Sequence, residues 1–261
     1  FRADPEKEGS LSSDRVFALA EGDSGELWLG LGDGALGTFD PATKRFSAVR
    51  FASANTRAVR CLLVDQGGRV WAGTEGDGLL RYDPAAARFD RFVHDGNAPT
   101  GIASNVVRSL LEDSGGRVWA GLAGGGVDLY SEGGFRHAAS QPGAAAPRDA
   151  VRALAQDAEG RVWVGYADSG LGTIDVSTLE LTPPLPGQEA MVRSIYPDRR
   201  GLIWVGFKDG GLRTYNLRSA LFARHRTLSG GAPLRDLRGM CQDASGRLLV
   251  GSDGGGIAAF D

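Results

Sequence analysis

An arginine recurs at one position of a repeated sequence pattern. It stands eleven residues before a tryptophan in four copies and eleven before a leucine in a fifth: Arg60, Arg108, Arg152, Arg193 and Arg238. In another copy the same position is occupied by Phe17. A guanidinium group carries a permanent charge and five N–H donors in a planar fork that fits a carboxylate or a sulfate. If these side chains gather in the fold, their mutual repulsion requires negative charge among them.

Two sources of that negative charge remain open. In the first, aspartates from a nearby turn form ion pairs with arginines of neighbouring copies, and the column is structural; the candidates are Asp33, Asp77, Asp168, Asp209 and Asp253. In the second, an anionic ligand such as an acidic sugar binds some of the arginines, with Phe17 as an apolar contact. The loops leading into the arginine-bearing segments range from the long residues 94–105 and 139–150 to the short 185–190. Variable loops on a rigid scaffold commonly carry binding specificity, so Phe17 and the five arginines are the candidate ligand-binding residues.

Other residue types form no catalytic or metal-binding pattern. The three histidines, His94, His137 and His225, lie in or just past segments expected at the outer rim of separate repeats. They are therefore too far apart to share a metal, and no zinc-binding spacing is present. No serine or cysteine stands in a Gly-x-Ser-x-Gly setting. The sequence predicts a protein that is not an enzyme, with no catalytic residue, no metal and no cofactor.

Two further motifs have structural interpretations. GDGALG at residues 32–37 matches Gly-x-Gly-x-x-Gly, but a strand rather than a helix is expected after it, so it is interpreted as a turn. Cys61 and Cys241 lie in apolar runs without metal-ligand spacing, and both are expected to be buried free thiols.

The elements that must position these side chains follow from the repeat itself. Its six copies are centred on Trp28, Trp71, Trp119, Trp163, Trp204 and Leu249, and glycine stands two residues after each. In the second copy, residues 59–64, 69–73, 79–82 and 88–93 have the character of short strands, separated by Gly, Asp and Pro turns. Four short strands repeated six times are typical of a β-propeller, in which each repeat is one blade.

We therefore predict an all-β chain that forms a single β-propeller domain over residues 1–261. Its four-stranded antiparallel blades are expected at about residues 14–50, 57–94, 105–138, 149–183, 190–226 and 235–261. The last blade ends after its third strand, so residues 1–5 are expected to complete it and close a six-bladed ring; alternatively, the chain is part of a seven-bladed ring. The first strand of each blade is expected to be innermost, which gathers the arginines at one mouth of the channel. Each tryptophan is expected to be a plug between neighbouring blades.

Composition restricts the class of partner. The net charge is −3, whereas nucleic-acid-binding domains are normally basic, so no nucleic-acid partner is expected. No apolar run approaches the length of about 18 residues that a membrane span needs. The chain opens on the charged FRADPEKEG, in which no signal peptide is visible.

The repeat also resembles a known family. Its pattern D-x-x-G-R-V-W-x-G, followed by G-G-L-x-x-Y-D and a later Phe, is similar to the two-component regulator propeller repeat. That repeat occurs in the extracytoplasmic sensor regions of bacterial hybrid histidine kinases and some diguanylate cyclases, usually in seven-bladed rings. The resemblance implies a periplasmic, non-catalytic sensor that binds an oligosaccharide, another small molecule or a protein, and that reaches the membrane only through downstream segments. An interaction scaffold is the alternative; a propeller lyase is disfavoured because no histidine falls on a first strand.

Overall fold

The computed structural model describes residues 2–4, 6–49, 57–98, 100–131, 134–140, 149–182, 185, 190–216, 221–225, 236–253 and 255–260. These residues form strands and turns and contain no helix, and therefore none that could span a membrane. The chain divides into two compact units, Phe1–His137 and Ala138–Asp261. We call them the N-terminal and C-terminal units and describe each by itself.

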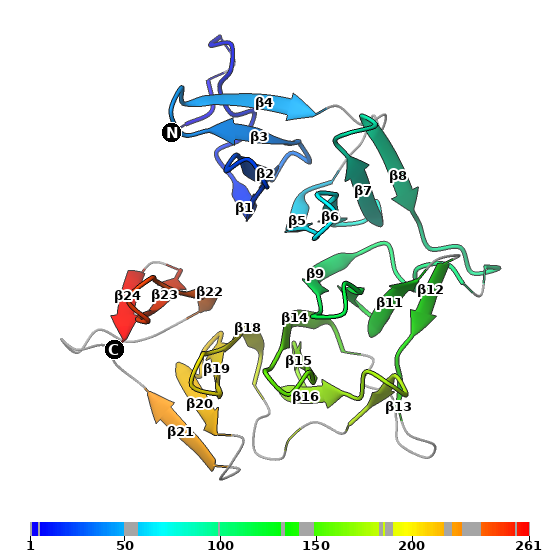
Figure 1. The fold of residues 1–261 in the computed structure, drawn as a ribbon, viewed down its shortest axis with the longest axis vertical. Coiled ribbons are helices and arrows are strands. Elements are labelled where there is room, and N and C mark those ends of the chain that lie inside the picture. Colours follow the sequence, from blue (N-terminus) through cyan, green and yellow to red (C-terminus); the bar gives the residue numbers. More distant parts are fainter. Residues whose placement is uncertain are drawn as a thin grey trace. The chain divides into compact units, whose positions relative to one another are not determined.

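The N-terminal unit contains three four-stranded antiparallel sheets, each with its strands in sequence order (Figure 1). Blade one consists of β1 (Val16–Glu21), β2 (Leu27–Leu31), β3 (Leu36–Asp40) and β4 (Arg45–Val49). Blade two consists of β5 (Val59–Val64), β6 (Val70–Thr74), β7 (Leu79–Asp83) and β8 (Arg88–Phe92). Blade three consists of β9 (Val107–Glu112), β10 (Val118–Leu122), β11 (Val127–Ser131) and β12 (Gly134–His137).

The C-terminal unit contains three more sheets of the same design. Blade four consists of β14 (Val151–Gln156), β15 (Val162–Tyr166), β16 (Leu171–Ile174) and β17 (Glu180–Leu181), with β13 (Ala139–Ser140) added in parallel to β17. Blade five consists of β18 (Val192–Pro197), β19 (Leu202–Phe207), β20 (Leu212–Asn216) and β21 (Leu221–His225). Blade six consists of β22 (Leu237–Gln242), β23 (Leu248–Ser252) and β24 (Gly256–Phe260).

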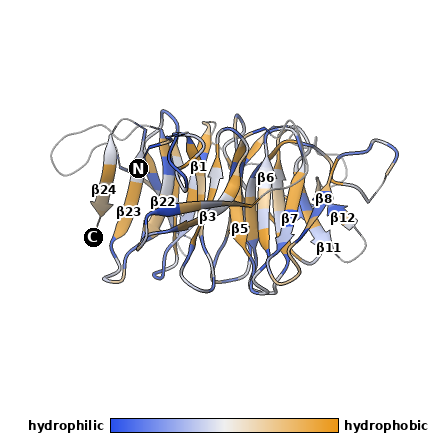
Figure 2. Ribbon diagram, turned by 90° about the horizontal axis from the view of Figure 1, so that it is seen from above, coloured by the Kyte–Doolittle hydropathy of each residue, from blue (hydrophilic) through white to orange (hydrophobic). Residues whose placement is uncertain are grey.

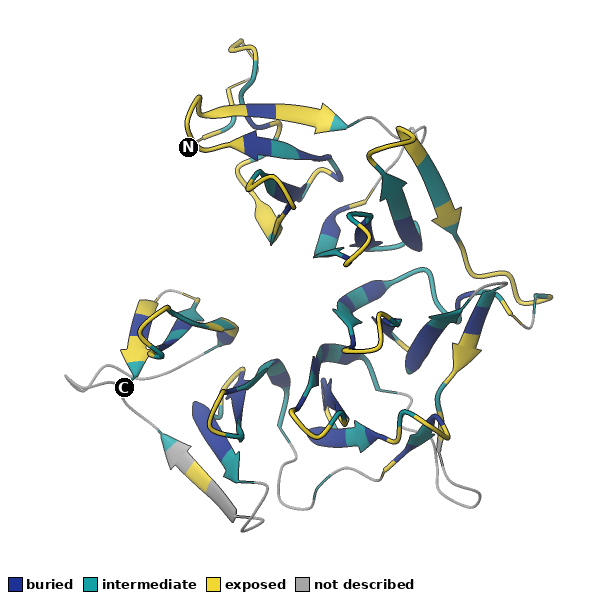
Figure 3. Ribbon diagram, in the orientation of Figure 1, coloured by how far each residue is buried: buried dark blue, intermediate teal, exposed yellow. Residues whose placement is uncertain are grey.

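The predicted fold class is confirmed: the chain is an all-β propeller of six antiparallel blades. The hydrophobic residues concentrate in the strands and the hydrophilic ones in the connecting turns, as Figure 2 shows. Within a blade, the second strand is the most buried, and every residue of β6 and β10 is buried, whereas β4 is mostly exposed (Figure 3). The single domain over residues 1–261 and the completion of the last blade by residues 1–5 stay predictions.

A buried aspartate fixes the turn between the first two strands and the tryptophan that follows it. Asp65 Oδ1 accepts hydrogen bonds from the backbone N–H groups of Gly67 and Arg69, at 3.0 and 2.9 Å. Its Oδ2 accepts from Arg69 Nε and from Trp71 Nε1, both at 2.7 Å. The same indole bond joins Asp113 to Trp119, Asp157 to Trp163 and Asp198 to Trp204. The carboxylate therefore orients the indole ring as well as closing the turn.

The first blade obtains this contact in a different way. Gly22 stands where the other copies have aspartate, and Trp28 Nε1 donates instead to Glu26 Oε1 at 3.2 Å. A carboxylate two residues before the tryptophan thus replaces one six residues before it, and Trp28 remains only 4% exposed.

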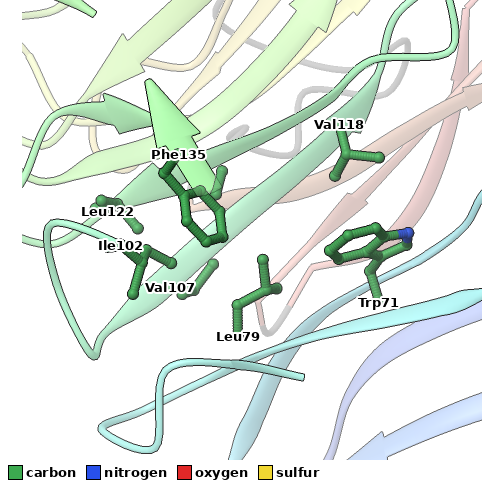
Figure 4. Close-up of a cluster of buried hydrophobic side chains, with 8 residues drawn as sticks. Trp71, Leu79, Ile102, Val107, Val118, Leu122 and Phe135 are labelled. Atoms are coloured by element: carbon green, nitrogen blue, oxygen red, sulfur yellow. The ribbon is translucent and has the colours of Figure 1, made fainter. Parts of the chain in front are cut away.

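Four tryptophans, Trp28, Trp71, Trp163 and Trp204, pack in one cluster each with residues of the next blade, as expected of plugs between blades. Trp71 of blade two is fully buried and packs in one cluster with Val107, Val118 and Phe135 of blade three (Figure 4). Two residues later, Gly73 lies so close to blade three that a Cβ there would come within 2.8 Å of Val107 Cγ1. The repeated hexapeptide GRVWAG is therefore a buried second strand whose last glycine admits the neighbouring blade.

Candidate ligand-binding site

The turn after each second strand lies beside the start of the first strand of the same blade. In blade two, the N–H of Glu75 donates to the carbonyl oxygen of Ala58 at 3.0 Å. Equivalent bonds in other blades join Gly32 to Arg15, Ala123 to Val106, Ala167 to Ala150 and Lys208 to Met191. The arginines on the first strands and the acidic residues of these turns therefore share one face of each blade, as predicted.

In the N-terminal unit, one carboxylate joins two arginines of the column. Arg60 Nε on β5 lies 2.5 Å from Glu75 Oε2. Both terminal nitrogens of Arg108 on β9 donate to the same carboxylate, each at 2.6 Å. All three side chains are partly buried, with exposed fractions between 19% and 31%. Glu75 thus makes a bidentate ion pair across the junction between blades two and three.

Phe17 lies next to this pair. Its ring centroid is 4.2 Å from the guanidinium carbon of Arg60, a cation–π geometry. The residue is 41% exposed, so the ring is open to solvent on β1. A Cβ at Gly32 would come within 3.1 Å of the Phe17 ring, so this glycine makes room for it. We call Phe17, Arg60, Glu75 and Arg108 the Phe17 cluster.

In the C-terminal unit, aspartates neutralise Arg193 and Arg238 of the column. Arg193 Nε lies 2.7 Å from Asp236 Oδ1, and Arg238 lies 2.8 Å from both Asp236 Oδ2 and Asp253 Oδ2. Two guanidinium groups therefore face two carboxylates. Arg152 occupies the corresponding position on β14 and is partly buried.

Of the turn aspartates considered from sequence, Asp253 pairs with an arginine of the column. Asp77 instead binds Arg91 at 2.9 Å and accepts from the backbone N–H of Arg57, while Asp33 accepts from Ala35 of its own turn. The principal counter-charges, Glu75 and Asp236, were not identified from the sequence. Glu75 stands four residues after its tryptophan, where four other copies have Gly32, Ala123, Ala167 and Lys208 and the sixth has Asp253. Only two of the six copies thus carry an acid at this position, which is too few to mark it as an acidic column.

The charges of the Phe17 cluster do not cancel. Two guanidinium groups share one carboxylate, which leaves an excess positive charge beside a solvent-exposed aromatic ring. Such a site can accept an anionic group and the apolar face of a ring together, because the guanidinium fork supplies donors and the phenyl ring supplies a platform. The one carboxylate of the cluster, Glu75, is engaged by both arginines.

The histidines lie at the outer strands, where the sequence places them. His137 ends β12 and His225 ends β21, and His94 follows β8. His137 Nδ1 is 2.7 Å from Oδ1 of the fully buried Asp128, a partner the sequence analysis missed. Burial raises the pKa of the Asp128 carboxyl, although the hydrogen bond from His137 opposes this. Among the described residues, no group of three or more His, Cys, Asp or Glu side chains could hold a metal ion.

The prediction that both cysteines are buried is wrong for Cys241. Cys61 lies partly buried against blade three, 3.8 Å from the carbonyl oxygen of Val107, and burial raises the pKa of its thiol to about 12. Cys241 is exposed. It is paired in register with Leu249, which stands where the other copies have the larger tryptophan, so less apolar surface covers it.

Part of the sequence matches a known family model. Residues 101–124, which contain β9 and β10, match the model described as two component regulator propeller. This match confirms the predicted resemblance. No curated protein sequence matches the chain.

Several solved structures share the fold. The extracellular domain of the hybrid two component system BT3049 from B. thetaiotaomicron aligns with a TM-score of 0.80 and 19% identity, covering 100% of this chain and 35% of that one. PorZ, a surface component of the type-IX secretion system of Porphyromonas gingivalis, aligns with a TM-score of 0.73 and 18% identity over 93% of this chain and 38% of that one. Virginiamycin B lyase from Staphylococcus aureus aligns with a TM-score of 0.73 and 12% identity over 94% of this chain and 84% of that one. At these identities, the similarity concerns the fold alone.

Proposed function

We propose that this chain is a sensory propeller, the periplasmic input module of a bacterial two-component or diguanylate cyclase signalling protein. The family match over residues 101–124 and the similarity to an extracellular domain of a hybrid two component system support this assignment. The chain spans 35% of that extracellular domain.

The ligand site we propose is the Phe17 cluster, and the observation that carries it is the exposed phenyl ring stacked on Arg60. An exposed aromatic ring is a platform for the apolar face of a sugar ring. Arg60 uses one donor on Glu75, and its guanidinium has five. The remaining donors, beside an uncancelled positive charge, suit a carboxylate on that sugar. We therefore propose an anionic carbohydrate or a similar small anion as the ligand.

We further propose that the chain is not an enzyme. Virginiamycin B lyase shares the propeller fold, which makes a lyase the alternative to weigh. In the N-terminal unit, however, His94 and His137 follow or end outer strands, whereas the Phe17 cluster lies on the first strands and their adjoining turn. The one carboxylate of the cluster, Glu75, is held in ion pairs with Arg60 and Arg108, so the cluster offers charge and stacking rather than a free acid–base group.

The test is a thermal-shift screen with acidic and neutral oligosaccharides. Acidic oligogalacturonides should raise the melting temperature, because a ligand that binds only the folded state stabilises it. Phe17→Ala and Arg60→Gln should each remove the shift, whereas Val93→Ala, which truncates a side chain of similar exposure (43% against 41%), should retain it. A shift that survives both cluster substitutions would place the ligand elsewhere.

A further inference from the structure

The N-terminal segment folds back on the outer strands of blade one. The N–H of Phe46 on β4 donates to the carbonyl oxygen of Gly9 at 2.7 Å, and Ala3 pairs with Leu11 in a parallel bridge. Leu11 is 8% exposed and packs in one cluster with Phe39 and Phe46. This segment is therefore anchored beside β3 and β4, as Figure 1 shows.

The segment and the β3–β4 hairpin line a cavity of about 330 Å³ that is open to solvent on one side. Its size falls at the lower end of the range for small-molecule sites. Leu11, Phe39 and Phe46 give it an apolar floor. Its charged lining consists of the cations Arg2, Lys7 and Lys44 and the carboxylate of Asp4.

These three cations do not form ion pairs with neighbouring acidic residues that the structure describes. Within the described residues, no ion pair involves Arg2, Lys7 or Lys44, whereas Arg45 of the same hairpin pairs with Glu8 at 3.3 Å. The chain contains 29 cationic residues, of which only three are lysines, and two of those three line this cavity. Three cations against one carboxylate leave an excess of two positive charges.

The turn does not demand a lysine at position 44. Lys44 has a left-handed backbone with φ of 60°, and so have Ala87 (47°) and Leu179 (62°) at the same position of the third-to-fourth-strand turn in blades two and four. The backbone conformation therefore belongs to the turn, and the identity of the side chain is free. The fold therefore does not require the ammonium group of Lys44.

We propose that this cavity binds a small organic dianion with an apolar body, of the aromatic dicarboxylate class. Two negative charges balance the excess of two positive charges, and the apolar floor accepts the body of the ligand. The site lies at the outer strands of blade one, whereas Phe17 lies on the inner strand β1, so the inference does not depend on the proposed function. Because the three cations are exposed, binding weakens as salt screens them.

The test uses phthalate as the probe, titrated by calorimetry into the whole chain at low salt, with benzoate and benzyl alcohol for comparison. Phthalate should bind more tightly than benzoate, benzyl alcohol should not bind, and affinity should fall on raising the salt concentration. Lys44→Ala should weaken phthalate binding about fivefold, the upper range of an exposed ion pair. Ala87 already occupies this turn position in blade two, so the variant should keep the wild-type melting temperature.

Lys208→Ala, which removes the exposed third lysine, is the matched control and should bind phthalate like the wild type. Lys7→Ala is the second variant and should weaken binding by a similar factor. Three results would overturn the proposal: no phthalate binding, equal binding of benzyl alcohol, or unchanged affinity in both lysine variants. Failure of oligogalacturonide binding at Phe17 would leave all of these measurements unaffected.

Discussion

Replacing Asp113 by alanine should lower the free energy of unfolding by more than a typical substitution in a surface turn does. Asp113 is 1% exposed. It accepts bonds from the N–H groups of Gly115 and Arg117 at 2.9 and 3.0 Å, from Arg117 Nε at 2.7 Å and from Trp119 Nε1 at 2.8 Å. After the change, the turn N–H groups can bind water, but the indole N–H of the fully buried Trp119 loses its acceptor.

The magnitude follows from these contacts. A buried donor left without a partner costs about 1–3 kcal/mol, and the ion pair with the 40%-exposed Arg117 adds at most about 1 kcal/mol. We therefore expect Asp113→Ala to lower the free energy of unfolding by about 1–4 kcal/mol, measured by urea denaturation.

Two matched variants isolate the indole bond. Asp243 makes the same turn contacts, accepting from Ser245, Arg247 N and Arg247 Nε, but Leu249 replaces the tryptophan, so Asp243→Ala should cost less. In a Trp119→Phe background, no indole N–H remains, and Asp113→Ala should lose about 1–2 kcal/mol of its effect. The role of the carboxylate in orienting the tryptophan would be refuted by either of two results. One is a small loss of unfolding free energy in Asp113→Ala; the other is an equal loss in the wild-type and Trp119→Phe backgrounds.

The remaining predictions concern packing, charge and pH. Gly73→Ala should destabilise by about 1–3 kcal/mol in thermal unfolding, because its Cβ would meet Cys61 and Val107; Gly96→Ala, where a Cβ meets nothing within 4 Å, should be neutral. Glu75→Gln should lower the melting temperature while leaving Phe17 exposed; a rise would mean that the carboxylate is a net cost at this site. Stability should fall as pH drops below about 4, as urea midpoints will report. Burial alone would raise the pKa of Asp113, but its hydrogen bonds hold that pKa below the usual value. The ionised Asp113 therefore stabilises the folded state at pH values above its pKa in the unfolded chain. This stabilisation is lost as the pH falls through its lower pKa in the folded state. An unchanged midpoint down to pH 2 would contradict this.

The blades were predictable because the strand segments, the turn residues, the tryptophan and the glycine all recur with the same repeat. Five of the six second strands carry a tryptophan, and all six carry a glycine two residues later. Packing between blades leaves little freedom there: Val107 is fully buried against Gly73. The aspartate of each turn was also visible, but its bond to the indole was not, because sequence spacing does not show which way a side chain points.

The candidate site was only partly predictable, because it depends on residues that break the period. The sequence marks Phe17 and the arginines through their shared column, and the structure brings Phe17, Arg60 and Arg108 together. Glu75, which joins the two arginines, stands at a position where only one other copy has an acid, Asp253. The cavity beside β4 was missed for a related reason: residues 2–11 precede the first repeat, so no copy offers a pattern with which to compare them.

The central claim is that the Phe17 cluster binds an anionic carbohydrate, and calorimetric titration of trigalacturonate tests it most directly. The account predicts binding to the wild type and to Lys44→Ala, no binding to Phe17→Ala or Arg60→Gln, and weaker binding of the uncharged trisaccharide maltotriose. Binding of trigalacturonate that is unchanged in both cluster variants, or equal binding of maltotriose, would contradict it.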